Sequence, residues 1–494
     1  MVKDKIQKHH EVVLDTINIE KKNKAPQYQQ LYEQLRNLIR QGSLRAGMCL
    51  PSSRSLATDL KIARNTVITA YEQLETEGFI ETSHGLLARI SDLPSMSNTE
   101  DLTPLVDLTK NISKRGHSVI IQHHTSGSAT TNLFQPGMPD MREFPLALWR
   151  RFVTEKLKYQ ANDVFGYHSF AGHPALREEI ASYVETSRGV VCSARQVLVT
   201  NGAQSAINLL AELYTDPGDE VLFEDPGYTG AQGAFRSANV KLRPLIVDSK
   251  GWHIKNLNKI NPKLIYLTPS CQFPLGLTMP IEQRLRLIDY SERKDAWIIE
   301  DDFDSEYRFS TKPIPALQGT SHNRVTLYIG SFSKTLFPGL RIGFIVFPGN
   351  VTEEISKMNY LLGNIAPLFL QAALAEFMMH GHFAKHLRKM KKIYGQRRAL
   401  FKGSIDEKMS TWLEQLDKGA GLQTAWQLKN STSDTALANT AKTHNLKLTP
   451  LSGHFLFREP IQGLILGYAG MNEYEIEPAV EKLQKVFIEH FRST

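Results

Sequence analysis

The stretch "SFSKTLFPGLRIGF" (residues 331–344) decides how this chain is interpreted. It comes directly after an apolar, β-prone run at 325–330. The stretch itself contains two serines and Lys334, followed by a Pro-Gly turn and Arg341. A lysine near a second cation and an anion site can have a lowered pKa and attack an aldehyde. An isolated lysine would instead be a solvated surface residue, so the rest of the chain must decide.

Four other β-type runs also end in polar or turn residues. "VLVT" precedes "NGAQS", "VLFE" precedes "DPGY", "LIYLT" precedes "PSCQFP", and "WIIE" precedes "DDFD". In open α/β sheets, ligands bind outside the carboxyl ends of the strands, where the loops converge. The pattern predicts an α/β domain with a mostly parallel sheet and one composite site.

Each loop offers a different chemical group. Gly202 precedes an amphipathic helix that starts near Ala203, so the free N–H groups there, with Gln204 and Ser205, could bind an anion. Tyr228 could stack on a planar ligand, and Asp301 or its neighbour Asp302 could keep a ring nitrogen protonated. Taken singly, these features fit an ordinary strand–helix turn, a core tyrosine and a capping aspartate. Together with Lys334 and Arg341 they match the groups that pyridoxal 5′-phosphate requires.

From about Phe134 onward the chain resembles the fold-type I, or aspartate aminotransferase-like, enzymes, and "SFSKTLFPGLRIG" looks like their cofactor-lysine motif. The resemblance implies a small C-terminal α+β subdomain, an internal aldimine at Lys334, Asp301 against the pyridine nitrogen and Tyr228 on the ring. It also implies a phosphate site formed by Gly202, Ala203, Gln204, Ser331, Ser333 and Arg341.

The amino-terminal part has a different pattern. Apolar residues from Tyr28 to Ile39 fall at helical spacing, two further helices follow, and "FIETSHGLLARI" alternates like a small hairpin. "LPSSRSLATDLKIARNTVITAYEQLETEGFIE" resembles the GntR-type winged helix-turn-helix, although a three-helix protein-interaction module is an alternative. The resemblance implies a helix from near Arg64 in the major groove and these DNA contacts: Arg54, Arg64, Asn65, Thr66 and Gly85 in the wing. Ala63 departs from the family, which usually has a serine there, so we expect no side-chain cap at the start of this helix.

We expect a flexible lead at 1–25, the winged helix-turn-helix at 26–91, a linker at 92–130 with a short ordered piece near 119–121, and the aminotransferase-like domain at 131–494. This arrangement resembles the MocR/GabR family of regulators, as do "FQPGMPD" and "EDDFDSEYRF". Two substitutions depart from the resemblance. Phe303 stands where relatives often have a tyrosine, and Ile465 stands near the arginine that clamps a substrate carboxylate, with Arg458 the nearest arginine. Either the clamp comes from elsewhere or the ligand is not a typical α-amino acid.

Composition sets broad limits. The net charge of +7 permits a polyanionic partner without requiring one, and no signal peptide or membrane-length apolar run is apparent, so we expect a cytoplasmic protein. The three cysteines (Cys49, Cys192 and Cys271) lie far apart, which argues against disulfides or a zinc ribbon. His382 and His386 have helical metal-ligand spacing but no third ligand, so we expect no metal.

These observations predict a pyridoxal phosphate-dependent transcriptional regulator that binds operator DNA and senses a small amine, an amino acid or a B6 vitamer through the aldimine at Lys334. The resemblance implies a head-to-tail homodimer and at most partial or slow transamination. Two alternatives stay open: a genuine aminotransferase with an accessory DNA-binding module, and a DNA-binding protein whose second domain only dimerises.

Overall fold

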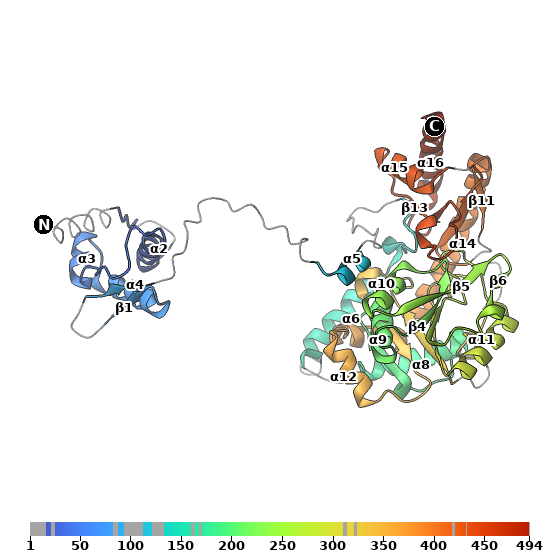
Figure 1. Cartoon of the computed structure of the whole chain (residues 1–494), viewed down its shortest axis with the longest axis horizontal. Coiled ribbons are helices and arrows are strands. Elements are labelled where there is room, and N and C mark those ends of the chain that lie inside the picture. Colours follow the sequence, from blue (N-terminus) through green and yellow to red (C-terminus); the bar gives the residue numbers. More distant parts are fainter. Residues whose placement is uncertain are drawn as a thin grey trace. The chain divides into compact units, whose positions relative to one another are not determined.

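The computed structural model describes residues 16–20, 25–82, 87–92, 112–120, 133–159, 164–166, 170–309, 314–320, 324–416, 420–430 and 432–493. The chain divides into two compact units, Met1–Asn111 and Ile112–Thr494 (Figure 1). The finer domain boundaries expected from the sequence stay predictions.

The first unit is a three-helix domain with a short hairpin. Its elements are α2 (Gln27–Arg40), α3 (Ser53–Asp59), α4 (Arg64–Thr76), β1 (Ile80–Glu81) and β2 (Arg89–Ile90), and the two strands pair antiparallel. The apolar stripes converge on one core, in which Leu31, Leu35, Leu56, Val67 and Leu74 are buried. Tyr28 differs from the predicted stripe, since it is 36% exposed. Gly85, predicted in the wing, lies outside the described residues.

Part of the predicted flexible lead instead packs against α2. Ile17 is buried in the core of this unit. The backbone N–H groups of Asn18 and Glu20 donate to the side-chain amide oxygens of Gln34 (2.9 Å) and Gln30 (3.0 Å). The two glutamines therefore satisfy backbone groups of residues 16–20, a role that hydrophobic periodicity does not reveal.

Helix α4 begins without a side-chain cap, as the sequence predicts. Ala63 has the extended backbone of an N-cap residue (φ −69°, ψ 140°) but no side-chain acceptor. Ala63→Ser should add an acceptor for the first free N–H groups of α4 and stabilise the helix start by about 1 kcal/mol. Hydrogen exchange of the intact chain should slow at Asn65, whereas the Thr66 N–H already donates to the carbonyl oxygen of Ala63 (3.0 Å). Ala63→Val, which has no hydroxyl, serves as the control, and equal exchange in both variants would contradict the predicted cap.

The second unit contains an eight-stranded sheet in the order β3-β10-β9-β8-β7-β4-β5-β6. β10 runs antiparallel to both β3 and β9, and β6 runs antiparallel to β5, while the remaining neighbours are parallel. The strands are β3 (Val197–Thr200), β4 (Glu220–Asp225), β5 (Lys241–Asp248), β6 (Gly251–Trp252), β7 (Pro262–Leu267), β8 (Trp297–Asp301), β9 (Thr326–Ser331) and β10 (Gly343–Val346). The predicted α/β class with a mostly parallel sheet is confirmed.

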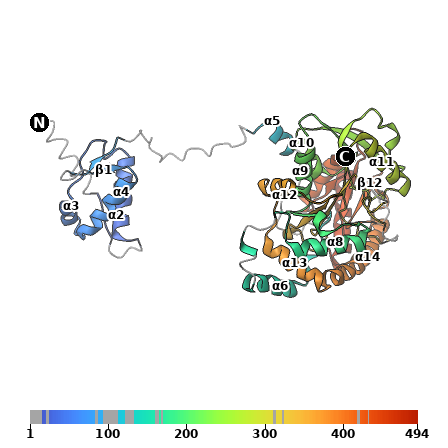
Figure 2. The same cartoon turned by 90° about the horizontal axis from the view of Figure 1, so that it is seen from below.

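Helices cover both faces of this sheet. On one face α9 (Ala203–Tyr214), α10 (Thr229–Ser237) and α12 (Glu353–Leu361) share a core with Val221 and Phe223 of β4. On the other face lie α6 (Leu146–Tyr159), α8 (Pro174–Arg188), α11 (Ile281–Lys294) and α13 (Leu368–Met379), with α8 and α13 side by side in Figure 2. Because both faces are covered, the strands are continuously apolar instead of alternating.

A short helix, α5 (Lys114–Ile120), lies within the stretch predicted to be a linker. It overlaps the ordered piece expected near 119–121 and packs against α10 (Figure 1).

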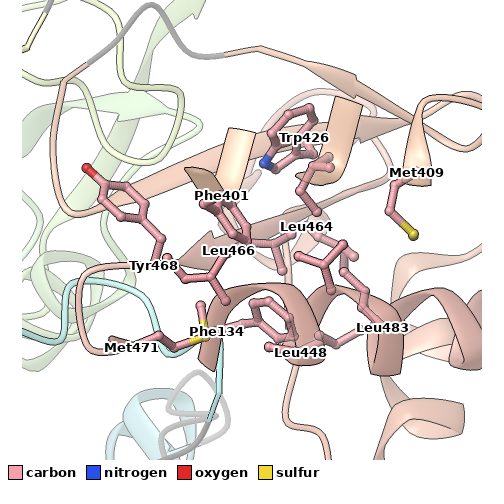
Figure 3. Packing of buried hydrophobic residues seen from close by; sticks show 14 of the residues in the cluster. Phe134, Phe401, Met409, Trp426, Leu448, Leu464, Leu466, Tyr468, Met471 and Leu483 are labelled. Atoms are coloured by element: carbon pink, nitrogen blue, oxygen red, sulfur yellow. The ribbon is translucent and has the colours of Figure 1, made fainter. Parts of the chain in front are cut away.

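A C-terminal subdomain completes the second unit, as the resemblance implied. It has an antiparallel sheet in the order β11-β12-β14-β13. Figure 3 shows its core, into which Phe134 inserts from the start of the unit, and the N–H of Gly467 donates to the carbonyl oxygen of Phe134 (2.9 Å). The elements are β11 (Leu413–Gln415), β12 (Gln423–Leu428), β13 (Thr449–Pro450), β14 (Gly463–Gly467), α14 (His382–Met409), α15 (Asp434–Thr443) and α16 (Glu473–Ser493).

Candidate functional site

The loops predicted to form the site follow β3, β4, β7, β8 and β9. These five strands run in the same direction, so their carboxyl ends share one edge of the sheet. Electrostatic coupling links Lys334 to Asp301, and Tyr228 to both Asp301 and Arg341. Residues from three separate loops are therefore brought together.

Lys334 is partly buried and directed toward the loop at the start of the second unit. Its Nζ donates to the carbonyl oxygen of Gly137 (2.7 Å). Burial lowers the pKa of Lys334, although the carboxylates of Asp304 and Asp301 oppose that shift. A lowered pKa increases the fraction of neutral, nucleophilic amine. The structure thus gives Lys334 the environment of a reactive amine.

Gly137 is a site residue that sequence reasoning did not single out. Its φ of +61° is unfavourable for other residues, and a Cβ at this position would lie only 2.6 Å from Nζ of Lys334. The motif "FQPGMPD" was the only signal for this contact. The backbone conformation therefore favours glycine here, and a side chain at this position would displace the flexible end of Lys334.

The sequence left open whether Asp301 or Asp302 could keep a ring nitrogen protonated, and the two carboxylates have different environments. The Asp301 carboxylate accepts from the hydroxyl of Tyr266 (2.6 Å). Burial raises the pKa of Asp301 to about 6, while Tyr266 and Lys334 act in the opposite direction. Asp302 instead forms an ion pair with Arg188 (2.6 Å) and accepts from the hydroxyl of Tyr328 (2.6 Å). Asp301 is therefore the carboxylate available to a ligand beside Lys334.

Tyr228 immediately precedes α10 and is half-buried. Its ring packs edge-on against Phe273 with centroids 5.6 Å apart, and Phe273 packs in the same way against Phe303. Burial raises the pKa of Tyr228 to about 12, and the nearby Asp301 adds to the increase. An aromatic wall therefore lies close to the buried carboxylate, and Phe303 contributes a phenyl ring to it in place of a hydrogen-bond donor.

The residues predicted to form an anion cradle lie at the start of α9. Gly202, the N-cap residue, has φ +83°, and a Cβ there would lie 3.5 Å from the guanidinium carbon of Arg341. Arg341 donates to the carbonyl oxygen of Asn201 (3.3 Å), and α9 then begins at Ala203. Free N–H groups of a helix start and a guanidinium are thus adjacent, which favours a phosphate.

The side chains of the other predicted phosphate contacts form hydrogen bonds with other groups of the protein. Gln204 donates its side-chain amide to the carbonyl oxygen of Gly230 (2.9 Å). The hydroxyl of Ser331 donates to that of Ser333 at 3.1 Å. Across the sheet, Gly343 of β10 pairs with both Ser331 and Thr200, so the serines and the start of α9 flank one strand.

Asp304 is a second carboxylate that sequence reasoning missed. It is 1% exposed and has φ +58°. Its Oδ2 accepts from the N–H of Leu422 (3.1 Å), whereas Oδ1 has no hydrogen-bond partner among the described residues. Burial raises the pKa of Asp304, and Lys334 opposes the increase. The motif "EDDFDSEYRF" contained this residue without indicating its direction.

The position expected for a carboxylate-clamping arginine is apolar. Ile465 is buried in β14 and packs in the core shared with α11. Arg458 donates to the carbonyl oxygen of Val247 (2.6 Å) and lies over the ring of Phe455. The nearest arginine in the sequence is thus bonded to β5.

The predicted DNA contacts lie around the starts of α3 and α4. Arg54, Arg64 and Asn65 are exposed, and Thr66 is partly buried. Arg64 donates from Nε to the hydroxyl of Ser53 (3.3 Å), which joins the two helix starts. The exposed N-terminal turn of α4 therefore carries polar and cationic groups that can face a DNA groove.

His386, weighed as a zinc ligand, lies instead in an aromatic cluster. It is buried, its ring is 5.7 Å from that of Phe144, and burial lowers its pKa to about 4. In the described parts of the chain, no three histidine, cysteine or acidic side chains form a metal-binding group. No helix in those parts has the length and apolar character needed to cross a membrane.

Two family descriptions match the chain. "Bacterial regulatory proteins, gntR family" covers residues 27–86, and "Aminotransferase class I and II" covers residues 143–483. The regulatory protein MocR of Rhizobium meliloti, described as probable and concerned with rhizopine catabolism, is 40% identical over 94% of each chain.

This chain belongs to the MocR-type family of GntR regulators. As a MocR-type protein it is a transcriptional regulator with a DNA-binding domain and an aminotransferase-like domain. The pyridoxine biosynthesis regulator PdxR of Corynebacterium glutamicum is 28% identical over 90% of this chain and 92% of its own length.

The aminotransferase-like fold is also found in solved structures. LysN, an α-aminoadipate aminotransferase of Thermus thermophilus solved with N-(5′-phosphopyridoxyl)-L-leucine, has a TM-score of 0.67 and 23% identity. The match covers 77% of this chain and 96% of LysN. At this identity the match establishes the fold of the MocR-type effector domain.

Proposed function

We propose that this regulator binds pyridoxal 5′-phosphate at Lys334 and changes its affinity for operator DNA when a small amine, an amino acid or a B6 vitamer binds there. The observation that carries the proposal is the position of the Lys334 amine, which is coupled to Asp301 while Arg341 lies beside the start of α9. An aldehyde, a ring nitrogen and a phosphate could each find a matching group.

The bound cofactor would supply an electrophilic aldehyde. Lys334 would provide the amine for that carbon, Asp301 would hold a proton on the ring nitrogen, and Tyr228 would pack on the ring. Arg341, Gly202, Ala203 and the serine pair would hold the phosphate. A homodimer is consistent with the aminotransferase-like fold, and ligand binding would act by favouring one of two domain arrangements.

The DNA-binding part of the proposal predicts specific losses of affinity. Arg64→Ala and Asn65→Ala should each weaken binding to a duplex selected from random sequences by the intact protein. The expected loss is roughly ten- to hundredfold, because base-contacting side chains contribute at this level. Retardation assays at fixed salt measure the loss, and the matched control is Thr76→Ala at the exposed far end of α4. If Arg64→Ala and Asn65→Ala both bound the duplex with unchanged affinity, α4 would be excluded as the recognition helix.

A genuine aminotransferase is a second candidate, since the "Aminotransferase class I and II" match spans residues 143–483. Sustained multiple turnover with an amino donor and a keto acid would support it. A single half-reaction combined with ligand-dependent DNA retardation would support the regulator.

A further inference from the structure

The buried carboxylate of Asp304 is not used by the cofactor assignments above. It follows β8 and is 1% exposed, with one oxygen accepting from Leu422 and the other without a hydrogen-bond partner among the described residues. The carboxylates of Asp304 and Asp301 both favour the charged form of Lys334 and so oppose the lowering of its pKa by burial. A buried carboxylate oxygen without a donor is costly unless a ligand or a cation satisfies it.

Gln423 approaches the same place from the C-terminal subdomain. It begins β12 and is 8% exposed, and its backbone is paired with Gly467. Its side-chain oxygen lies 3.6 Å from the point where a Cβ on Gly137 would sit, and Nζ of Lys334 lies 2.6 Å from that point. The Gln423 amide therefore borders the space around the reactive amine.

Arginines that could bind a ligand carboxylate are occupied elsewhere. Arg458 is bonded to Val247, and Arg397 is bonded to Asp140 and to Glu473. Arg308 donates to the Ser270 carbonyl and the Thr278 hydroxyl. The Gly137 carbonyl, the carboxylates of Asp304 and Asp301 and the Gln423 amide are found near Lys334, and acceptors of this kind select ligands that carry donors.

We propose that Asp304 and Gln423 form the subsite that recognises the far end of the effector, and that this effector is a primary amine carrying hydroxyl or ammonium donors instead of a carboxylate. The inference rests on the proposed function, because it takes Lys334 as the place where the amine end binds. Asp304 would accept from the donors, Gln423 would add one neutral hydrogen bond, and a ligand carboxylate would be repelled by Asp304.

A matched set of short amines tests this selectivity. The cofactor-loaded protein is titrated with 3-aminopropanol, 1,3-diaminopropane and β-alanine, and binding is followed by the change in cofactor absorbance and by the shift in melting temperature. The amino alcohol and the diamine should bind about ten- to hundredfold more tightly than β-alanine, the range expected for hydrogen bonds to a buried charge. Equal or tighter binding of β-alanine would overturn the inference.

Variants assign the selectivity to the two residues. Asp304→Asn, which keeps an acceptor for Leu422, should weaken the diamine about tenfold or more and reduce the discrimination against β-alanine. Gln423→Leu should weaken the amino alcohol, whereas Gln427→Leu, further along β12, should leave all three affinities unchanged. Unaltered selectivity in both site variants would refute the subsite.

Different results would contradict the proposed function and the inferred effector class. If the wild-type protein gains no cofactor absorbance, the proposed function is wrong. If the absorbance is present but the carboxylate ligand is preferred, only the inferred effector class is wrong.

Discussion

When the protein is loaded with excess pyridoxal phosphate, Lys334→Ala should abolish the absorbance, in the violet part of the spectrum, of the cofactor bound covalently to the protein. The variant lacks the amine whose pKa burial lowers, so no covalent link to the aldehyde can form. Borohydride reduction followed by mass measurement should then detect the cofactor on the wild type only. Because the covalent link to the aldehyde is lost, cofactor affinity should also fall at least about a hundredfold.

Lys357→Ala provides the matched control. Lys357 is an exposed lysine on α12 that pairs with Glu353 (2.7 Å). Its replacement should leave absorbance and labelling unchanged. A persistent band in Lys334→Ala, with normal circular dichroism, would show that another amine binds the aldehyde.

Local sequence patterns were sufficient to predict the main frame of the site. Strands buried on both faces are continuously apolar, and polar residues at their carboxyl ends must lie at one edge of the sheet. Gly202 and the helix after it, Lys334, and Arg341 beyond its turn are each recognisable within a few residues. The strand ends predicted from these runs are found in the structure.

Contacts between distant segments could not be predicted in this way. The choice between Asp301 and Asp302 is made by Arg188, which is 114 residues away from Asp302 in the sequence. The contact of Gly137 with Lys334 spans 197 residues. The approach of Gln423 likewise depends on how the C-terminal subdomain packs, which no hydrophobic period encodes. Such contacts determine which hydrogen-bond and charge partners each predicted residue has.

Arg188→Met should strongly destabilise the second unit. The Arg188 guanidinium is 3% exposed and donates to Asp302 (2.6 Å), to the hydroxyl of Ser270 (2.6 Å) and to the carbonyl oxygen of Ile314 (2.6 Å). Burial opposes its charge, but Asp302 keeps the pKa of Arg188 above its ordinary value. Removing the cation leaves a buried carboxylate unpaired, which typically costs about 3–5 kcal/mol.

Urea unfolding followed by tryptophan fluorescence measures this loss selectively. The five tryptophans (Trp149, Trp252, Trp297, Trp412 and Trp426) all lie in the second unit. Arg293→Met is the control, because the exposed Arg293–Asp289 pair on α11 should contribute less than about 1 kcal/mol.

A double variant separates charge from packing at this position. In Arg188→Met with Asp302→Asn neither charge remains, and the asparagine can still accept from Tyr328 (2.6 Å in the wild type). The double variant should therefore recover part of the lost stability. An additive loss would mean that Arg188 acts through packing and its two other hydrogen bonds. In that case the charge of Arg188 would not be what holds the Asp302 carboxylate in its position.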